Sequence, residues 1–494
     1  MAFNSFEFAL FFAVTFGLFL ATDTKRSWIV LLLSSIVFYG ALLQPHLLLV
    51  LAGVTFVSFL CATGIEKSGT EAGRRAFLWV GILGTLLPLF YLRYLHFVVD
   101  TLESVLGLAH GPAIGSTETV LSSVGVSFYC FQAISYLADV HSGYQKAERH
   151  FGYFALYLAF FPKLLQGPIE RGNVFLPQLR QPFMIRYETM RYAAVLFAWG
   201  LFKKVAIADG ISPLVDPVYE SVHSFHGLAL CVATALYAVQ IFADFSGYTD
   251  MALGVGAFFG IRLTQNFASP YYAWSIPEFW RRWHISLSEW LMHYLFMPLQ
   301  RGLIRWRKAA APAAVVVTFL ICGIWHGANW TYVIWGGING VYLAVSYLTK
   351  KTRARLVALV GLNKHRSLHR SMQVCITFAL VCFAWIWFRA STVSDAGYVV
   401  RTILLDPLSV GPGHGLAEFV KQNFLLGRPW KEFIVPLLLI SVLATIEFLN
   451  HSGKTLDLLF RKPLLVRWAF YYLLVLSTIF LGQFEKRAFI YLQF

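Results

Sequence analysis

Two apolar runs joined by a short polar turn constrain this fold more than any other feature of the sequence. The runs cover residues 311–325 and 331–348. As helices they reach about 22 and 27 Å, against a bilayer hydrocarbon core of about 30 Å. Because basic flanks favour the cytoplasmic face, we expect a hairpin that enters from the cytoplasm and turns deep in the membrane. The basic residues that bound the pair are Arg305, Arg307 and Lys308 before it, and Lys350, Lys351 and Arg353 after it.

The turn of this hairpin carries polar groups at the depth where they cost most. His326, the helix breaker Gly327 and the amide of Asn329 lie in the sequence WHGANW between the two runs. Polar side chains at such a depth are expensive, and they more often mark function than decoration. We therefore predict a functional site around His326. The competing interpretation is a packing histidine that is bonded to a carbonyl of a neighbouring helix.

The composition places the chain among polytopic membrane proteins. Of its 494 residues, 58% are hydrophobic and 13% are charged, which is too apolar for a soluble globular domain. The formal net charge is +15, but the basic residues stand in short loops between apolar runs. This distribution fits the positive-inside rule and attraction to anionic lipid, and it argues against nucleic-acid binding.

The apolar runs predict an all-α membrane fold with about 11–12 transmembrane helices, plus re-entrant and interfacial helices. No Lys or Arg precedes the first run and no cleavage site is evident, so we expect a retained first helix. The basic loop at Lys25 and Arg26 should be cytoplasmic, which places the N-terminus outside. Besides the hairpin, the expected spans are 6–20, 28–43, 47–62, 76–92, 120–140, 190–208, 227–243, 372–388, 433–449 and 467–483.

Three segments are too irregular or too polar for simple spans. Residues 151–186 hold a short apolar run followed by PKLLQGPIERG, which is typical of a re-entrant element. Residues 244–272 are too polar and too rich in glycine for a lipid-facing span. Residues 276–299 predict an amphipathic helix at the membrane interface, capped by Ser275. An external or interfacial connection is expected at 93–118, and an external loop at 390–431.

Two histidines suit acid–base chemistry, since His326 and His284 both follow a tryptophan in segments too polar for lipid exposure. A neutral imidazole in a partly desolvated site accepts a proton from a hydroxyl near neutral pH. Asn329 or a backbone N–H could hold an acyl carbonyl as charge develops on its oxygen. No GxSxG elbow is present. The pattern therefore favours direct acyl transfer, with the base activating the hydroxyl of the acceptor.

Metal and cysteine chemistry are less favoured. The six cysteines form no CxxC, so neither a disulfide framework nor a zinc site is suggested. His365 and His369 form an HxxxH without a carboxylate nearby, and we expect no metal and no bound cofactor. Cys322 precedes His326 by about one helical turn. A Cys/His nucleophile pair therefore stays open as an alternative.

Around both histidines the sequence resembles the membrane-bound O-acyltransferase family. It looks closest to the bacterial branch that holds the alginate O-acetylase membrane subunit and the D-alanyl transfer protein of lipoteichoic acid. WHGANW together with FWRRWHISLSEWL (279–291) carries the resemblance most specifically. The other segments, in family order, are FQAISYLADV (131–140), PKLLQGPIER (162–171), DFSGYTDMALGVGAFFGIRLTQNF (244–267), GIWHGANWTYVIWGGINGVYL (323–343), FRASTVSDA (388–396) and the terminal FIYLQF.

The resemblance implies a ring of helices around a thinned centre with a tunnel. It implies one domain over 1–494, with N-terminal helices (1–140), a catalytic core (151–350) and C-terminal helices (372–494). The implied activity moves an acetyl or other short acyl group at a bacterial inner membrane. The donor is a cytoplasmic thioester, acetyl-CoA or an acyl carrier protein. The acceptor is an extracytoplasmic polysaccharide or cell-wall glycan, reached directly or through a periplasmic acyltransferase partner.

The resemblance also assigns roles to individual residues. His326 is the expected catalytic histidine, and His284 assists it from across the reaction chamber. Arg281 and Arg282 are candidates for the donor mouth, although a positive-inside role explains them equally well. Supporting or chamber-lining positions are Trp325, Asn329, Asp244, Ser246 and Tyr248, of which the last three are explained about as well by helix breaking.

Departures from the family pattern leave the acceptor open. Relatives of the alginate type usually carry Arg-Asp-Tyr and Pro-Leu-Gly-Gly after the interfacial helix. The departing residues are Met292, His293 and Tyr294, then Pro298, Leu299, Gln300 and Arg301, and also His141 in DVHSG.

The main rival class is a transporter or channel with an intramembrane polar pathway, and the absence of internal repeats counts against it. A second rival is a sensor that binds the donor without chemistry.

Overall fold

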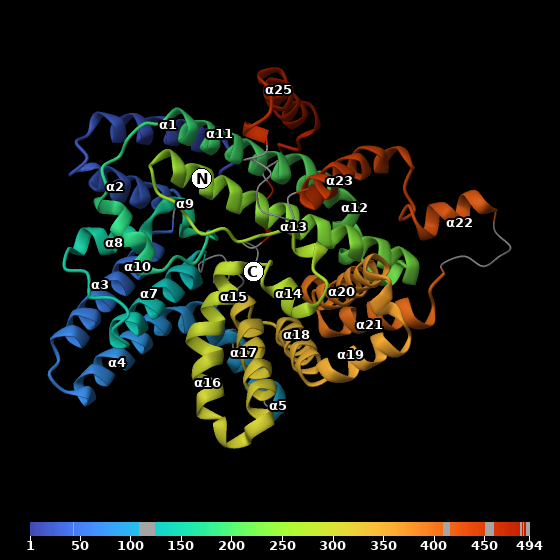
Figure 1. Ribbon diagram of the computed structural model, residues 1–494, viewed down its shortest axis with the longest axis horizontal. Helices are drawn as coiled ribbons and strands as arrows, with labels where there is room; N and C mark the ends of the chain where they lie inside the picture. The colour runs from blue at the N-terminus through green and yellow to red at the C-terminus, as the bar shows by residue number, and fades with distance from the viewer. Residues whose placement is uncertain are drawn as a thin grey trace. The chain divides into compact units, whose positions relative to one another are not determined.

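In the computed structural model, every regular element of the described residues is helical (Figure 1). The structure describes residues 1–42, 44–107, 124–408, 415–449, 459–484, 487, 489 and 490. Seven helices in this part are long and apolar enough to cross a membrane by length and composition. The prediction of an all-α polytopic membrane fold is therefore confirmed. These helices are Pro45–Lys67, Glu71–Leu106, Gly227–Phe258, Ile304–His326, Arg366–Arg389, Lys431–Leu449 and Leu464–Leu481.

Seven is fewer than the predicted 11–12 spans, because several predicted spans form helices that are too short or not apolar enough to be counted. The first two are α1 (Phe6–Ala21) and α2 (Ser27–Gly40), with 16 and 14 residues. The trailing arm of the hairpin is α18 (Trp330–Leu348), whose glycines, Asn339 and aromatic residues dilute its hydropathy. The expected span at 120–140 is α7 (Val126–His141), and residues 120–123 lie outside the described part.

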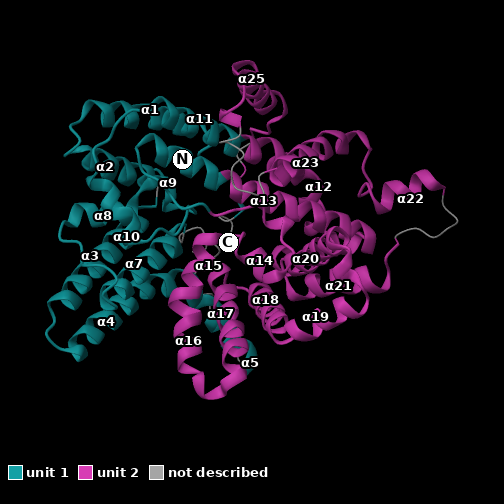
Figure 2. Ribbon diagram, viewed as in Figure 1, with its two compact units in different colours: residues 1–201, 248–265, 488–494 teal, residues 202–247, 266–487 magenta. Residues whose placement is uncertain are grey.

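The helices gather into two compact units that interleave along the chain (Figure 2). Unit 1 comprises Met1–Leu201, Tyr248–Gln265 and Ala488–Phe494. Unit 2 comprises Phe202–Gly247 and Asn266–Arg487. The prediction of one domain over 1–494 stays a prediction. Within the terminal FIYLQF, residues 491–494 lie outside the described part.

Unit 1 is built around an aromatic core. The rings of Phe8, Phe38 and Phe161 meet at centroid distances of 5.6–6.5 Å, and Phe161 also meets Phe259 at 5.9 Å. Helix α3 packs against both α4 and α7, and α2 packs against α8. The remaining bounds in this unit are α3 (Pro45–Lys67), α4 (Glu71–Leu89), η1 (Phe90–Tyr94), α5 (Leu95–Leu106), α8 (Phe151–Ala159), α9 (Phe161–Leu164), α10 (Gly172–Phe175), η2 (Leu176–Arg180) and most of α11 (Tyr187–Phe202).

The PKLLQGPIER segment of unit 1 is irregular, and protein buries all of it except the half-buried Arg171. Lys163 and Glu170 are both 0% exposed. The Lys163 ammonium donates to the side-chain oxygen of Gln132 and to the carbonyl of Tyr157. The Glu170 carboxylate accepts from the backbone N–H and the hydroxyl of Thr264. Hydrogen bonds from the protein thus compensate both buried charges. The surrounding protein also keeps lipid away from the irregular backbone, as expected at membrane depth.

Unit 2 contains the hairpin and the helices that pack on it. The hairpin helices α17 (Ala310–His326) and α18 lie side by side, and α18 packs against α20 (Arg366–Arg389) and α14 (Ile276–Trp280). The other bounds are η3 (Lys203–Ala208), α12 (Asp209–Glu220), η4 (Val222–Ser224), α13 (Gly227–Phe258, in this unit to Gly247), η5 (Pro270–Tyr272), α15 (Ile285–Leu291), η6 (Met292–Phe296), α16 (Met297–Gly302), η7 (Ile304–Ala309), α19 (Lys350–Leu359), η8 (Leu362–Lys364), α21 (Val393–Leu405), α22 (Leu416–Asn423), α23 (Lys431–Leu449) and α25 (Leu464–Leu481).

The predicted continuous helix over 276–299 is wrong. Ser275 does cap its start by accepting from the N–H of Glu278 at 3.3 Å. The chain then breaks at His284, which has φ +44°, and resumes as α15. The predicted apolar stripe is buried inside the protein instead of facing lipid, because rings of unit 2 cover it. Its members Phe279, Trp283, Leu287, Trp290 and Leu291 are each at most 6% exposed.

Three segments that were not predicted as spans contain helix. Residues 95–106 form α5 within the predicted external or interfacial connection, of which residues 108–118 lie outside the described part. Residues 393–405 form α21 within the predicted external loop. Thr392 starts α21 by accepting from the N–H of Asp395 at 3.0 Å, a capping pattern that the prediction overlooked. Helix α13 also runs on to Phe258 through the polar, glycine-rich segment. Because Asp244, Ser246 and Thr249 are each 1% exposed, protein rather than lipid surrounds that polarity, as predicted.

Glycine allows the two hairpin helices to touch. A Cβ on Gly336 would meet the carbonyl oxygen of Phe319 and lie 3.1 Å from the Cα of Gly323. We expect Gly336→Ala to lower the free energy of unfolding by about 1–3 kcal/mol through overpacking. Thermal unfolding in detergent measures this loss. The control is Gly337→Ala, whose Cβ would make only an ordinary contact of 3.4 Å with Leu320. Equal stability of both variants would contradict close packing at Gly336.

Candidate active site

The hairpin places His326 at the last position of α17, where the helix must stop. Gly327 continues in extended backbone, and Asn329 caps α18 by accepting from the N–H of Thr331 at 3.0 Å. The amide nitrogen of Asn329 donates to the carbonyl of Ser391 at 3.0 Å. Asn329 therefore fixes the turn. Its predicted contact with an acyl carbonyl stays a prediction.

Aromatic rings enclose the His326 imidazole, which is 4% exposed. Its centroid lies 4.8 Å from Trp325, 4.9 Å from Trp335 and 5.2 Å from Phe388. The last two rings meet it edge-on, at 86° and 77°. These rings come from α17, α18 and the end of α20. Such walls shield the imidazole from bulk water.

His284 lies next to the same tryptophan, on a different element. Its ring centroid is 6.4 Å from Trp325 and 4.8 Å from Phe245 of α13. A hydrogen bond from the N–H of Ile285 to the carbonyl of Asn266, at 2.9 Å, stabilises the left-handed backbone at His284. The indole of Trp325 thus lies beside both histidines. The structure therefore brings the two predicted catalytic residues into one aromatic-walled site within unit 2.

Asn266 determines which nitrogen of His284 carries the proton. Its Oδ1 accepts from the backbone N–H of Ser286 at 3.2 Å and from the Ser286 hydroxyl at 2.7 Å. Because a backbone N–H can only donate, this atom must be the amide oxygen. His284 Nδ1 lies 3.3 Å from the same oxygen and therefore acts as a donor. The neutral ring then presents Nε2 as its basic nitrogen. Burial lowers the pKa of His284 to about 3, so the ring is neutral at physiological pH.

Asp244 and Ser246 flank Phe245 on α13, but their side chains bind lysines. Lys204 donates to Asp244 at 2.7 Å, and Lys203 donates to the Ser246 hydroxyl at 2.9 Å. The structure therefore gives both residues a part in buried polar contacts. Tyr248 falls in unit 1, where its ring stacks on Phe3 at 4.8 Å and meets Phe489 edge-on at 5.2 Å. Chamber-lining roles for these three residues stay predictions.

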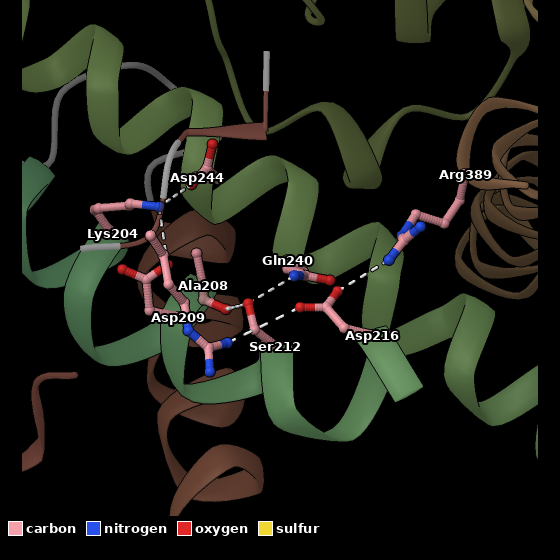
Figure 3. Close-up of polar contacts among 9 residues, drawn as sticks. Lys204, Ala208, Asp209, Ser212, Asp216, Gln240, Asp244 and Arg389 are labelled. Atoms are coloured by element: carbon pink, nitrogen blue, oxygen red, sulfur yellow. Dashed lines mark hydrogen bonds and ion pairs between the residues drawn. The ribbon is translucent and has the colours of Figure 1, made fainter. Parts of the chain in front are cut away.

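Two groups of polar contacts join elements of unit 2 (Figure 3). The Lys204 ammonium binds both Asp244 and Asp209, the latter at 2.8 Å, and all three side chains are at most 3% exposed. Further along α12, Asp216 pairs with Arg389 at 3.1 Å. Arg389 directly follows Phe388, one of the rings around His326. The ion pair of Asp216 and Arg389 therefore ties the end of α20 that supplies this ring to α12.

Arg281 and Arg282, the candidates for the donor mouth, share one carboxylate. Arg281 lies 2.6 Å and Arg282 2.8 Å from the oxygens of Glu278. Burial acts to raise the pKa of Glu278, but hydrogen bonds from the two guanidinium groups hold it below its usual value. The carboxylate is therefore ionised at neutral pH. Two cations against one anion leave positive charge on this surface.

Sequence reasoning missed several members of the site. Asn266 stands in the TQNF part of a segment noted only for its polarity, while Phe245, Trp335 and Phe388 look like ordinary core residues. Asn266 lies 18 residues before His284 in the sequence, so only the folded structure shows that its buried amide contacts the histidine. No sequence pattern marked these aromatic residues as part of the site, because apolar residues are expected throughout a membrane protein.

We expect Asn266→Ala to lower kcat about 10- to 100-fold, because His284 loses the oxygen that orients its ring. Asn266→Asp keeps an acceptor and should restore part of the rate. The added carboxylate also raises the pKa of His284, so the acid limb of the kcat profile should move to higher pH. Steady-state kinetics across pH measure both effects, and Ser288→Ala is the control. Equal kcat for wild type and Asn266→Ala would contradict the positioning role.

The sequence is similar to proteins of known families. A model of the membrane-bound O-acyltransferase family matches residues 144–388, which contain both histidines. A probable alginate O-acetylase of Pseudomonas aeruginosa is 37% identical over 92% of this chain and 84% of its own length. A peptidoglycan O-acetyltransferase of Helicobacter pylori is 31% identical over 76% of this chain and 73% of its own. A teichoic acid D-alanyltransferase of Streptococcus thermophilus is 29% identical over 52% and 65%, respectively.

The fold and these similarities define a multi-pass membrane acyltransferase. The chain belongs to the membrane-bound O-acyltransferase family. The resemblance inferred from WHGANW and FWRRWHISLS is thereby confirmed, and family membership decides against a transporter or channel.

Proposed function

We propose that this enzyme moves an acetyl or other short acyl group from a cytoplasmic thioester to a hydroxyl of an extracytoplasmic polysaccharide or cell-wall glycan. The observation that carries the proposal is the pair of buried histidines beside the indole of Trp325. Three relatives, named for action on alginate, peptidoglycan and teichoic acid, support a polymeric acceptor. The basic flanks of the hairpin support a donor that enters from the cytoplasm. The basic loop at Lys25 and Arg26 supports an inner-membrane location with the N-terminus outside.

In this mechanism His326 acts as the general base. Its neutral imidazole takes the proton of the acceptor hydroxyl as the oxygen attacks the thioester carbonyl carbon. The tetrahedral intermediate collapses, the carbon–sulfur bond breaks, and the imidazolium returns the proton to the leaving thiolate. His284 orients the acyl group or the base, and Nε2 is the nitrogen it presents. Atoms and charge balance without a metal or a bound cofactor.

The acceptor of the first transfer is either the glycan itself or a periplasmic acyltransferase that passes the group on. Both fit the same site, because each offers a hydroxyl to the same base. Purified protein in proteoliposomes with radiolabelled acetyl-CoA or acyl carrier protein tests the proposal, with alginate or peptidoglycan fragments as acceptors. We expect label to leave the thioester and appear as an ester, on the fragments or on an added partner. A thioester that stays intact under every condition would refute the proposal.

A further inference from the structure

A buried hydroxyl near the start of α18 takes no part in holding the fold together. Thr331 is the second residue of this helix and is 1% exposed. Its backbone N–H donates to the side-chain oxygen of Asn329 at 3.0 Å. In the part of the chain that the structure describes, its Oγ1 has no hydrogen-bond partner. Because an unpaired buried hydroxyl costs free energy, Oγ1 points to a ligand that pairs with it.

This hydroxyl belongs to the face of α18 that meets His326. Residues four apart lie above one another on a helix, so Thr331, Trp335 and Asn339 form one stripe. All three are at most 2% exposed. Trp335 meets the His326 ring edge-on, at a centroid distance of 4.9 Å. Because Cβ bonds tilt toward the helix N-terminus, the Thr331 side chain leans from this stripe toward the turn that follows His326.

The two amide side chains nearest to this hydroxyl already serve the fold at both ends. The oxygen of Asn329 caps α18, and its nitrogen donates to the carbonyl of Ser391 at 3.0 Å. The oxygen of Asn339 accepts from the indole of Trp280 at 3.3 Å, and its nitrogen donates to a carbonyl one turn back on α18 at 2.9 Å. The hydroxyl of Thr331 is therefore available to a ligand in a way that these amides are not.

The place of Thr331 also suits negative charge. Helix α18 has 19 residues, and the start of a helix carries the positive end of its dipole. During attack on a thioester, negative charge develops on the acyl oxygen. A hydroxyl donor at a helix N-terminus, shielded from water, stabilises charge at that position more strongly than it stabilises the neutral carbonyl.

We propose that the Thr331 hydroxyl donates a hydrogen bond to the acyl oxygen in the transition state, so that the start of α18 forms an oxyanion site beside His326. When the acceptor oxygen bonds to the carbonyl carbon, the π electrons of the C=O bond move onto the acyl oxygen. Thr331 keeps its proton and holds this oxyanion through the hydrogen bond. The C=O bond re-forms as the carbon–sulfur bond breaks and the thiolate leaves. This inference rests on the proposed function, since it requires acyl transfer at His326.

Thr331→Val tests the inference, because it replaces the hydroxyl by a methyl group of nearly the same shape. We expect kcat for transfer from acetyl-CoA to alginate fragments to fall about 10²–10³-fold, as for loss of one oxyanion donor. KM for acetyl-CoA should stay at its wild-type value, since the bond strengthens only as charge develops. Thr331→Ser keeps the hydroxyl and should retain most of the wild-type rate.

Stability and pH dependence separate this contact from a structural role. Because the hydroxyl has no partner among the described residues, Thr331→Val should unfold at or above the wild-type temperature. The pH profile of kcat should keep its shape, since the substitution removes no described hydrogen bond to His326. A lower unfolding temperature of Thr331→Val, or a displaced pH profile, would show a packing or positioning role and overturn the inference.

Thr318→Val is the matched control from the same hairpin. Thr318 is 2% exposed, but its hydroxyl donates to the carbonyl of Ala314 within α17 at 2.7 Å. This variant should keep the wild-type kcat, and an equal loss in both valine variants would overturn the inference. If wild-type protein consumes no thioester, the proposed function itself fails. Wild-type turnover with an unaltered Thr331→Val refutes the oxyanion contact alone.

Discussion

His326→Ala should lower kcat by about 10²–10⁴-fold, the contribution expected of a positioned general base. KM for the donor should change little, because the imidazole acts on the proton of the acceptor hydroxyl and not on the donor head. The three rings around His326 would remain, so the fold should persist. Steady-state transfer of labelled acetyl groups measures the loss, and thermal unfolding confirms that the protein is folded.

Two controls make this result specific. His293→Ala removes an exposed histidine of η6 and should leave kcat unchanged. Cys322→Ala tests the alternative of a Cys/His nucleophile pair, since Cys322 is buried one turn before His326. We expect it to retain activity. Full turnover by His326→Ala would show that the catalytic assignment is wrong, and loss of activity in Cys322→Ala alone would favour covalent catalysis by the thiol.

Lys204→Met should be the most destabilising single change in unit 2. It keeps the length of the side chain but leaves Asp209 and Asp244 buried without their shared cation (Figure 3). Breaking a buried ion pair from one side costs about 3–5 kcal/mol. The loss should appear as a lower unfolding temperature and a lower yield of folded protein in detergent.

The triple variant Lys204→Met, Asp209→Asn, Asp244→Asn separates charge from packing. It removes the uncompensated carboxylates and should recover much of the lost stability, because a neutral buried cluster no longer needs the cation. Wild-type stability of Lys204→Met alone would contradict a structural role for this ion triad. Failure of the triple variant to recover would show that shape, not charge, sets the cost.

The parts of the fold that could be predicted are those where one physical rule acts alone. Long apolar runs gave the all-α membrane class, and an expensive polar turn singled out His326. The cap at Ser275 followed from its own side chain and the next turn. His284 was singled out with His326, because both histidines follow a tryptophan in segments too polar for lipid exposure. The resemblance then assigned His284 its assisting role.

The parts that could not be predicted depend on contacts between distant segments. A helical stripe over 276–299 is a good local pattern, yet the backbone breaks at His284 because Asn266 binds the residues after it. The ion pair of Asp244 with Lys204, at 2.7 Å, likewise joins residues that are 40 positions apart. Tertiary partners override local propensity at both places, and no periodicity in the sequence reports them.

The claim at the centre of this account is that His326 and His284 act as one site beside Trp325. A double-mutant cycle tests it most directly, with kcat/KM measured for His326→Ala, His284→Ala and the double variant. Residues that act as a unit are strongly non-additive. The account predicts that the double variant loses little more activity than His326→Ala alone. If the two losses multiply instead, the histidines act independently, and the single two-histidine site is contradicted.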